Sequence, residues 1–380
     1  MKIAFITNLM NHHQVYLADE LYKYLGDEYK FIETIPIPNS LIQSGYPIIS
    51  RPYVIKAYQN AEQMEKAKRI AEEADVVIIG SAPECFVTKR IQEGKMTFRY
   101  HERWFKDKPW FLSGPRSWMN FYKNHIRYKN KPLYMLAASA FTIHDVNAIG
   151  AYKNKVFKWG YFTKVDHDHH IRRNINQNTK QISIMWCARF IKLKHPELPI
   201  KMSKILKDKG YKFSLDMYGS GTELEKSIHL AQELNVNDVV NFCGNLPNDQ
   251  ILKKMQEHEI FLFTSDKREG WGAVLNESMA NGCAVVASHL IGSVPFLIKD
   301  GDNGCIFKSE NLDSLVSKVI YLIENPNERE KISNNAIKTM QEVWCPSNAA
   351  KQFLNLVKAL QIGDSSLIPK DGPGSKAKRI

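Results

Sequence analysis

The chain has 380 residues, of which 44% are hydrophobic and 24% are charged, and its formal net charge is +12. This composition is typical of a globular protein and excludes wholesale disorder, while the length predicts two domains at about 150 residues each. No apolar stretch reaches the ~18 residues that a membrane-spanning helix requires. The six cysteines lie far apart, and the polar start at residues 1–8 differs from a secretory signal, so we expect a cytoplasmic protein with reduced thiols.

The first half of the chain alternates short apolar runs with longer amphipathic ones. Residues 2–7 have the pattern of a buried strand, and residues 12–25 place apolar side chains at helical spacing. Further strands are predicted at 29–35, 75–79, 110–112, 133–136 and 156–159, and a charged helix at 61–74. Strands that alternate with helices indicate a doubly wound parallel sheet, so we expect residues 1–165 to form a Rossmann-like domain.

A second alternation follows a polar linker at residues 166–180. Its predicted strands are 182–187, 213–218, 239–242, 260–264 and 284–287, and its predicted helices are 196–209, 223–234, 249–257, 272–281, 312–324 and 328–343. We expect residues 181–345 to form a second Rossmann-like α/β domain that faces the first across a cleft, with ligands at the carboxyl ends of the strands. A helix at 346–362 could cross back to the first domain, and the composition of residues 363–380 predicts a disordered tail.

The most informative stretch covers residues 266–287, where a strand ends, a loop carries Glu269, and a helix is predicted to begin near Gly272. Gly270 and Gly272 allow a ligand to approach the backbone, and the free N–H groups of a helix start favour a phosphate. Glu269 and Glu277 would repel that phosphate unless they accept hydrogen bonds from hydroxyls, which sugars and ribose supply. The pattern therefore indicates a sugar nucleotide.

Four motifs in chain order resemble a known family. Glu269 and Glu277 reproduce the E-x7-E motif of retaining GT-B glycosyltransferases of family 4, also called group 1. The other motifs are Arg189 with Lys194, which resembles the family's diphosphate site, Gly219 with Gly221, which resembles its G-x-G-x-x-x-L turn, and residues 240–246, which resemble the strand and loop that hold the base. The first half resembles the family only loosely, because residues 8–13 replace the glycine-rich loop that often follows the first strand.

The resemblance implies a role for each matching residue. The implied catalytic residues are Glu269, Arg189, Lys194 and His101, and the implied donor-binding residues are Glu277, Gly219, Gly221, Asn245, Leu246, Gly270, Trp271, Gly272, Ala273 and Val274. The two cations would stand in for a metal ion at the leaving diphosphate, so we expect no metal and no other cofactor. His12, His13 and Glu84 are candidate acceptor contacts. A structural alternative stays open for each motif, such as carboxylates that complement a helix dipole or glycines that only form a turn.

Residues 166–170 (DHDHH) contain residue types that bind metals. Their spacing matches no closed zinc site, and a polar hinge between domains explains the same residues. We therefore expect no metal site there.

Positive charge gathers in residues 89–131, where twelve basic residues face three acidic ones and leave +9, together with ten aromatic residues. Such a segment suits an anionic membrane surface, and it also suits nucleic acid. A solvated basic face beside ordinary core aromatics is a further alternative. We expect the membrane surface and no nucleic-acid partner, which would place the protein at the inner face of the plasma membrane.

These observations together predict a retaining glycosyltransferase that moves a sugar from a UDP- or GDP-sugar to a saccharide acceptor. The resemblance further implies a lipid-linked acceptor and a place in bacterial surface polysaccharide biosynthesis. A non-catalytic sugar-nucleotide or membrane-lipid-binding protein of the same fold is the alternative. A nicotinamide-dependent enzyme lacks support because no G-x-G-x-x-G follows a strand, and a nucleic-acid-binding protein rests on the basic segment alone.

Overall fold

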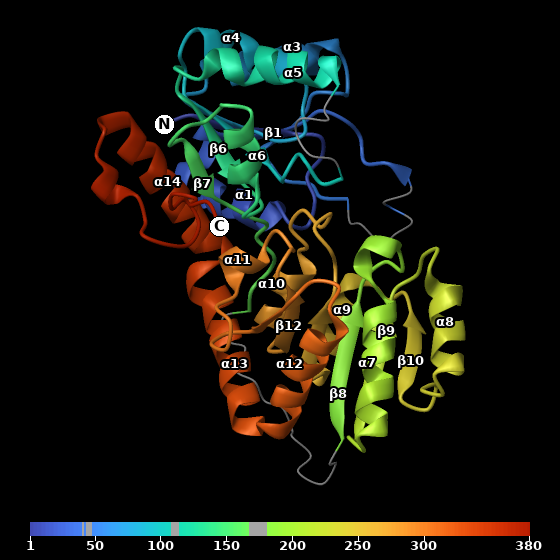
Figure 1. Ribbon diagram of the computed structural model, residues 1–380. Helices are drawn as coiled ribbons and strands as arrows, with labels where there is room; N and C mark the ends of the chain where they lie inside the picture. Colours follow the sequence, from blue (N-terminus) through green and yellow to red (C-terminus); the bar gives the residue numbers. More distant parts are fainter. Residues whose placement is uncertain (40–41, 43–47, 108–113, 167–180) are drawn as a thin grey trace. The chain divides into compact units, whose positions relative to one another are not determined.

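Two parallel β-sheets organise the chain, one in each of two units (Figure 1). The computed structural model describes residues 1–39, 42, 48–107, 114–166 and 181–380. Unit 1 contains residues 1–164 and 344–380, and unit 2 contains residues 165–343. The strand predicted at 110–112 and all but the first residue of the linker predicted at 166–180 lie outside the described residues. The C-terminal segment thus belongs with the first half of the chain.

The sheet of unit 1 has seven strands in the order β3-β2-β1-β4-β5-β6-β7, and all neighbouring pairs are parallel. The strands are β1 (Ile3–Thr7), β2 (Tyr29–Glu33), β3 (Val54–Lys56), β4 (Val76–Ile79), β5 (Thr97–His101), β6 (Leu133–Ala137) and β7 (Val156–Lys158). β1 and β4 are buried along their whole length, which is why they are continuous apolar runs in the sequence. The strand order reverses between them, so the loops that follow these two strands lie where such sheets bind ligands.

Helices cover both faces of this sheet (Figure 1). They are α1 (Val15–Leu25), α3 (Ala61–Glu73), α4 (Thr88–Gln92), α5 (Pro115–Asn124), α6 (Thr142–Ala148) and α14 (Pro346–Ile362). The buried side chains of α1 recur at helical spacing, as in Val15, Ala18 and Leu21, and α1 packs against α14. On the other face, Ala67 of α3 and Val146 of α6 belong to one apolar cluster with the strands. The C-terminal helix α14 therefore completes the core of the N-terminal sheet.

The C-terminal residues 363–380, for which the composition predicts disorder, have defined contacts in the structure. Phe157 of β7 pairs with Lys376 in an antiparallel bridge, and Lys158 N donates to Ser375 O at 2.7 Å. Ser375 is fully buried, and Lys158 Nζ lies 2.6 Å from Asp371 Oδ1. The physical reason is the free edge of β7, whose backbone groups need partners that the Gly- and Ser-rich tail supplies.

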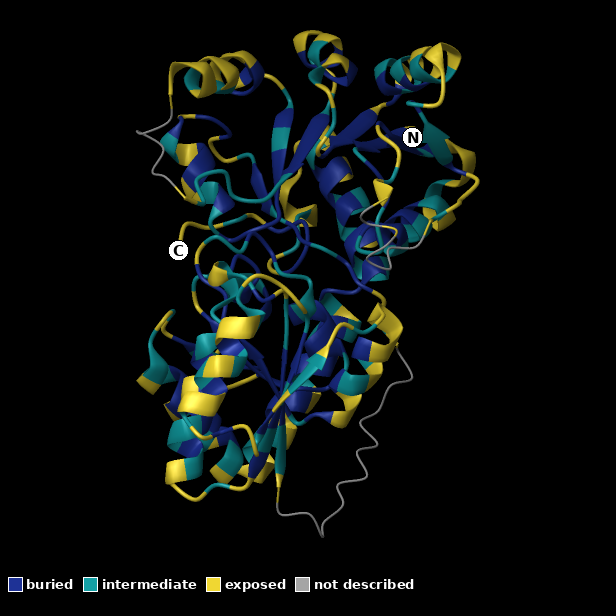
Figure 2. Cartoon of the chain, turned by 90° about the vertical axis from the view of Figure 1, so that its right-hand side faces the viewer, coloured by how far each residue is buried: buried dark blue, intermediate teal, exposed yellow. Residues whose placement is uncertain are grey.

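The sheet of unit 2 has six parallel strands in the order β10-β9-β8-β11-β12-β13. The strands are β8 (Ile182–Cys187), β9 (Phe213–Tyr218), β10 (Val240–Gly244), β11 (Ile260–Phe263), β12 (Ala284–Ser288) and β13 (Cys305–Phe307). The helices are α7 (Glu197–Asp208), α8 (Leu224–Glu233), α9 (Asn248–Glu257), α10 (Val274–Ala280), α11 (Val294–Leu297), α12 (Leu312–Glu324) and α13 (Pro326–Lys338), and a π-helical turn follows at Thr339–Val343. Side chains of α7, α8 and α12 share one apolar cluster with the sheet, whereas α10 packs against α9 and α13. Figure 2 shows that the central strands are mostly buried, whereas many residues on the outer sides of the helices are exposed.

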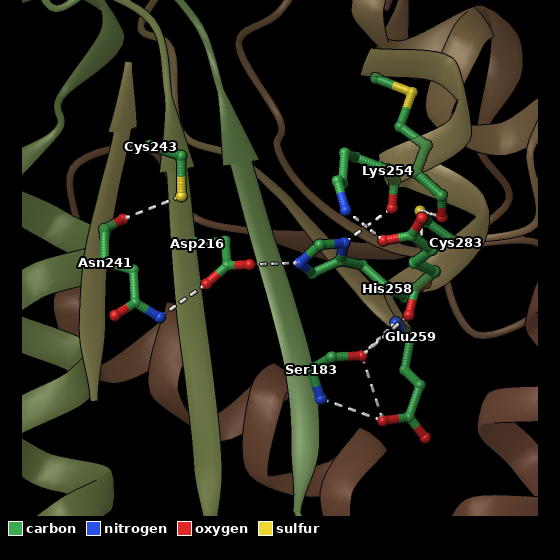
Figure 3. Close-up of polar contacts among 10 residues, drawn as sticks. Ser183, Asp216, Asn241, Cys243, Lys254, His258, Glu259 and Cys283 are labelled. Carbon is green, nitrogen blue, oxygen red and sulfur yellow. Dashed lines mark hydrogen bonds and ion pairs between the residues drawn. The ribbon is translucent and has the colours of Figure 1, made fainter. Parts of the chain in front are cut away.

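A polar network crosses the sheet of unit 2 (Figure 3). Asp216 in β9 accepts a hydrogen bond from Asn241 Nδ2 at 2.8 Å, and its Oδ2 lies 3.1 Å from His258 Nε2. The bond to His258 is the main reason why the pKa of Asp216 lies below its usual range. Glu259 Oε2 accepts from the backbone N–H of Ser183 at 3.0 Å. These contacts join β8, β9 and β10 to the residues just before β11, and so fix the strands that carry the candidate site.

No helix in the described parts of the chain combines the length and the apolar character needed to cross a membrane.

Candidate functional site

Three loops at the carboxyl ends of β8, β9 and β11 are tied together by backbone hydrogen bonds. Phe190 N donates to Ser220 O at 2.8 Å, which joins the loop after β8 to the loop after β9. Asp266 N donates to Leu193 O at 3.0 Å, which joins the loop after β11 to the loop after β8. The predicted residues of unit 2 therefore lie on loops that hold each other in place.

Gly219 and Gly221 are required by the packing of these loops. Their φ angles are +134° and +149°, which side-chain-bearing residues rarely adopt. A Cβ atom at Gly219 would lie 1.9 Å from Ala188 O, and one at Gly221 would lie 2.4 Å from Phe190 O. Glycine at both positions is thus explained by close backbone packing against the loop that begins with Arg189.

Lys194 and Glu269 form a direct ion pair between the loops after β8 and β11. Their side chains are only 12% and 15% exposed. Thr264 supports the pair from beneath, because its Oγ1 donates to Lys194 O at 2.6 Å and accepts from Trp186 Nε1 at 2.9 Å. Lys194, predicted to contact the diphosphate, and Glu269, predicted to contact the donor sugar, therefore bind each other directly, and Thr264 at the end of β11 supports them.

Arg189 differs from Lys194 in its surroundings. It is exposed at the end of β8, and it forms no ion pair within the described part of the chain. Its guanidinium is therefore available to an anion, and the planar fork suits the oxygens of a phosphate.

Glu277 is a buried carboxyl group inside α10. Burial raises its pKa from 4.5 to about 7, and a hydrogen bond from Asn248 Nδ2 at 3.5 Å opposes this only in part. The thiol of Cys187 at the end of β8 is an electrostatic neighbour, because burial first and the charge of Glu277 second raise the pKa of that thiol to about 12. Glu277 therefore changes near neutral pH from an acid that can donate to a carboxylate that only accepts.

The residues between Glu269 and α10 take a conformation set by Gly272. Its φ is +81°, and a Cβ atom there would lie 2.3 Å from Cζ of Phe263. The helix begins at Val274, after the start predicted near Gly272, so Gly270 to Ala273 precede it. Trp271, a predicted donor contact, is fully buried and its Nε1 donates to Asn276 Oδ1 at 2.8 Å. Its side chain is therefore a core group, and only its backbone is left for a ligand.

Asn245 and Leu246 follow β10, beside the loop after β9. Asn245 is exposed and its Nδ2 donates to Ser220 Oγ at 2.8 Å, whereas Leu246 is half-buried. Gly219 N donates to Gly244 O at 2.8 Å, which links the two loops. Both predicted base contacts thus lie at the same sheet edge as Arg189.

His195 and its neighbours were not among the predicted site residues. The chain is left-handed at His195, with φ +48°, and its Nδ1 and Nε2 lie 2.8 Å from Glu197 Oε1 and 3.2 Å from Asp266 Oδ2. Arg268 contributes a third charged contact, because its Nε lies 3.0 Å from Asp266 Oδ2. The hydrogen bond to Glu197 is the largest cause that raises the pKa of His195. We call the contacts among His195, Glu197 and Asp266 the clamp. The sequence signal for it is a histidine that directly follows Lys194 and precedes a glutamate by two residues.

The predicted residues of the first half, His101, His12, His13 and Glu84, all belong to unit 1. His101 ends β5, contacts Trp104 edge-on at 6.1 Å between ring centroids, and lines a cavity of about 550 Å³. Burial first and the charge of Arg99 second lower the pKa of His101 to about 4, so its imidazole is neutral at physiological pH. A neutral imidazole offers one donor and one acceptor to hydroxyls.

Glu84 forms an ion pair with Arg99. Both of its carboxylate oxygens accept from the guanidinium of Arg99, at 2.7 and 2.8 Å, and Arg99 is only 2% exposed. Removing Glu84 would leave a buried charge without its partner, so its first role is structural.

His12 and His13 lie in the turn between β1 and α1. Their ring centroids are 3.7 Å apart, and the ring of His13 stacks on Tyr161 at 5.5 Å. Burial lowers the pKa of both, to about 3 for His13, where the charge of His12 adds to the effect. Both side chains are therefore neutral aromatic groups at the switch point of the unit 1 sheet.

Comparisons with known proteins show what the chain is similar to. Residues 168–339 match the family described as glycosyl transferases group 1. An uncharacterised glycosyltransferase of Methanocaldococcus jannaschii is 31% identical over 188 residues, which are 49% of this chain and 47% of that protein. The poly(glycerol-phosphate) alpha-glucosyltransferase of Bacillus subtilis is 27% identical over 133 residues, 35% of this chain and 19% of that protein. The chain thus spans about half the length of the archaeal relative and much less of the bacterial one.

Solved structures define the fold class. The Anabaena protein HepE, crystallised with UDP, has a TM-score of 0.68 at 16% identity and covers 94% of this chain and 100% of its own. The lipopolysaccharide outer core galactosyltransferase WaaB has a TM-score of 0.68 at 16% identity, over 95% of this chain and 100% of its own. The chain therefore has the two-domain α/β fold called GT-B. Its segment 168–339 carries the match to group 1 glycosyltransferases, which supports a transferase enzyme.

Proposed function

We propose that this protein transfers a sugar from a nucleotide diphosphate sugar, with UDP or GDP as the carrier. The observation that carries the proposal is the Lys194–Glu269 ion pair near the exposed Arg189, inside the segment that matches group 1 glycosyltransferases. A diphosphate needs cations that are held in place, and a donor sugar needs acceptors for its hydroxyls. The pair supplies both in one contact.

In the proposed reaction, the bond between the anomeric carbon and the diphosphate oxygen breaks while the acceptor hydroxyl attacks from the same face. The hydroxyl proton moves to the departing phosphate oxygen, and the sugar retains its anomeric configuration. Arg189 and Lys194 stabilise the charge that builds on the diphosphate, an effect of about 10²- to 10³-fold in rate for one such donor. We propose that these cations do the work of a metal ion, so that no metal or other cofactor is required.

The two glutamates act on the donor as the E-x7-E motif of family 4 implies. Glu269 orients the sugar by accepting hydrogen bonds from its hydroxyls. The ion pair with Lys194 does not prevent this arrangement, because the ammonium of Lys194 has three N–H donors and can contact a phosphate while it stays paired with Glu269. Glu277 accepts from the ribose hydroxyls. Neither carboxylate suits a glycosyl-enzyme intermediate, since Glu269 is ion-paired and Glu277 is buried with a raised pKa, and front-face displacement follows.

We further propose a saccharide acceptor, carried on a lipid at the inner face of the membrane, in bacterial surface polysaccharide biosynthesis. Relatives named for transfer to poly(glycerol-phosphate) and poly(ribitol-phosphate), in Bacillus subtilis and Staphylococcus aureus, support a surface polymer as acceptor. The neutral imidazoles of His101, His12 and His13 on unit 1 suit the hydroxyls of an uncharged sugar.

The test is a panel of UDP- and GDP-sugars incubated with the full chain in the absence of acceptor. We expect slow release of the nucleoside diphosphate from one donor, at a rate above that of the enzyme-free sample. Tight binding of the same donor without release would favour the alternative, a non-catalytic sugar-nucleotide-binding protein. The proposal would be refuted if no donor in the panel bound to the protein and none released its nucleoside diphosphate.

A further inference from the structure

Helix α5 of unit 1 has one face against the core and one face open. Trp118 and Phe121 are partly buried and pack on the apolar cluster of the unit. Phe121 stacks on Trp104 with ring centroids 5.4 Å apart, and Asn124 is buried at the end of the helix. These contacts anchor the helix and fix which side chains point outward.

The open face of α5 combines large apolar side chains with cations. Met119 is 65% exposed and Tyr122 is 61% exposed, and Arg116 and Lys123 are exposed beside them. Residues 116, 119 and 123 are three, four and seven positions apart, so they share one face of the helix, and 122 adjoins it. Two large apolar side chains exposed next to two cations are unusual for a helix that only meets water.

The structure also shows where the surplus charge of residues 89–131 lies. Five of its cations are ion-paired, namely Lys89, Lys95, Arg99, Arg103 and Lys106, and Arg90 is buried among backbone carbonyls. Five exposed cations, Arg116, Lys123, Arg127, Lys129 and Lys131, have no ion pair within the described part of the chain. The excess is therefore concentrated on α5 and the turn that follows it, and not spread along the segment.

We infer that the open face of α5 is a docking surface for an anionic lipid membrane. Met119 and Tyr122 enter the headgroup region, while Arg116 and Lys123 meet the lipid phosphates. The helix has ten residues and is about 15 Å long, so it lies in the interface and does not cross it. The exposed apolar pair favours lipid over nucleic acid, which has no hydrocarbon layer to receive it.

This inference deepens the proposed function, because it names the surface at which a lipid-linked acceptor would be met. Its test does not depend on catalysis. The full chain is sedimented with vesicles of phosphatidylcholine alone, or mixed with phosphatidylglycerol, at low and high salt. We expect binding to the anionic vesicles at low salt and its loss at high salt.

Two variants and one control separate the contributions. Each cation near an anionic surface contributes about fivefold to binding, so Arg116→Gln/Lys123→Gln should bind about 25-fold more weakly. Met119→Ser/Tyr122→Ser should also lose vesicle binding while keeping all its charges. Lys351→Gln/Lys358→Gln removes two exposed lysines seven positions apart on α14, the same spacing and charge change, and should bind as the wild type does.

Three results would overturn the inference. They are a wild type that ignores anionic vesicles at low salt, a Met119→Ser/Tyr122→Ser variant that binds them unchanged, and an equal loss of binding in the α14 control. Donor hydrolysis by the same variants keeps the two proposals apart. Release of nucleoside diphosphate at the wild-type rate by Arg116→Gln/Lys123→Gln would leave sugar transfer standing, whatever the vesicles show.

Discussion

Replacing Glu277 by glutamine should change how the stability of unit 2 depends on pH. Burial raises the pKa of this carboxyl group from 4.5 to about 7. The folded protein therefore holds the proton more tightly than the unfolded chain does between these two values. The free energy of unfolding should fall as the pH rises through that window and then level off, because ionising a buried carboxyl destabilises the folded state.

The size of the effect follows from the difference in pKa. A difference of about 2.5 pKa units corresponds to about 3 kcal/mol of differential stability at 1.36 kcal/mol per unit. Glutamine has nearly the shape of the protonated acid but does not ionise. The variant should therefore exceed the stability of the wild type by only about 1 kcal/mol at pH 5 and by about 3 kcal/mol at pH 8.

The assay is urea unfolding of both proteins at several pH values from 5 to 8. Unfolding is detected by hydrogen exchange in peptides that contain α10, so that the stability of unit 2 is measured separately from that of unit 1. Other titrating groups are common to both proteins and cancel in the difference. A difference that stays flat across this pH range would show that Glu277 is not a buried, proton-holding group. It would also contradict the change of Glu277 near neutral pH from an acid that can donate to a carboxylate that only accepts.

Three further predictions concern the loops of the site. Gly272→Ala should lower the free energy of unfolding of unit 2 by about 2–4 kcal/mol, because at φ +81° it adds a methyl group 2.3 Å from the Phe263 ring. Gly210→Ala is the control: its φ is +80° but the space around it is open, so the free energy of unfolding should fall by only about 1–2 kcal/mol. Equal losses in denaturant unfolding would contradict this packing argument. Asparagine tolerates a left-handed backbone, so His195→Asn tests the contacts of the imidazole alone. The hydrogen bond to Glu197 raises the pKa of His195 above its ordinary value of 6.5, so the stability advantage of the wild type should be fully present at pH 6 and should be lost as the pH rises above 6.5 through the raised pKa. An advantage that persisted at pH 9 would argue against a charged histidine. Release of nucleoside diphosphate should survive excess EDTA, since Arg189 and Lys194 supply the positive charge, and a loss restored by magnesium or manganese would refute that assignment.

The fold could be predicted from the sequence wherever strands are continuous apolar runs. Strands β1, β4 and β8 lie within one residue of their predicted ranges, because they are central in parallel sheets. β1 and β4 are buried along their whole length, and β8 is buried in its second half except at Cys187. Strand β5 was missed because Arg99 interrupts its apolar pattern. That side chain is buried with two partners that the strand itself does not contain, the carboxylate of Glu84 and the backbone oxygen of Asn124. A contact of this kind leaves no periodic signal.

The site was predictable in its residue types but not in its internal contacts. The spacing of Glu269 and Glu277 and the order of the motifs indicated the chemistry, yet no spacing shows that Lys194 pairs with Glu269 or that Trp271 turns into the core. The clamp of His195, Glu197 and Asp266 joins two loops and depends on a left-handed residue. Such features follow from tertiary packing, which sequence periodicity does not encode.

The central claim is that Lys194, fixed by Glu269, stabilises a departing nucleoside diphosphate. The most direct measurement is the rate of nucleoside diphosphate release from the preferred donor, compared between Lys194→Ala and Lys192→Ala. Lys192 is an exposed lysine two residues earlier on the same loop, so the control makes the same change in charge. We predict a fall of about 10²- to 10³-fold for Lys194→Ala, with donor affinity much less affected, and a rate near that of the wild type for Lys192→Ala. Rates are compared well below the melting temperature of each variant, because Glu269 loses its partner in Lys194→Ala. Equal rates in the wild type and Lys194→Ala would contradict the account.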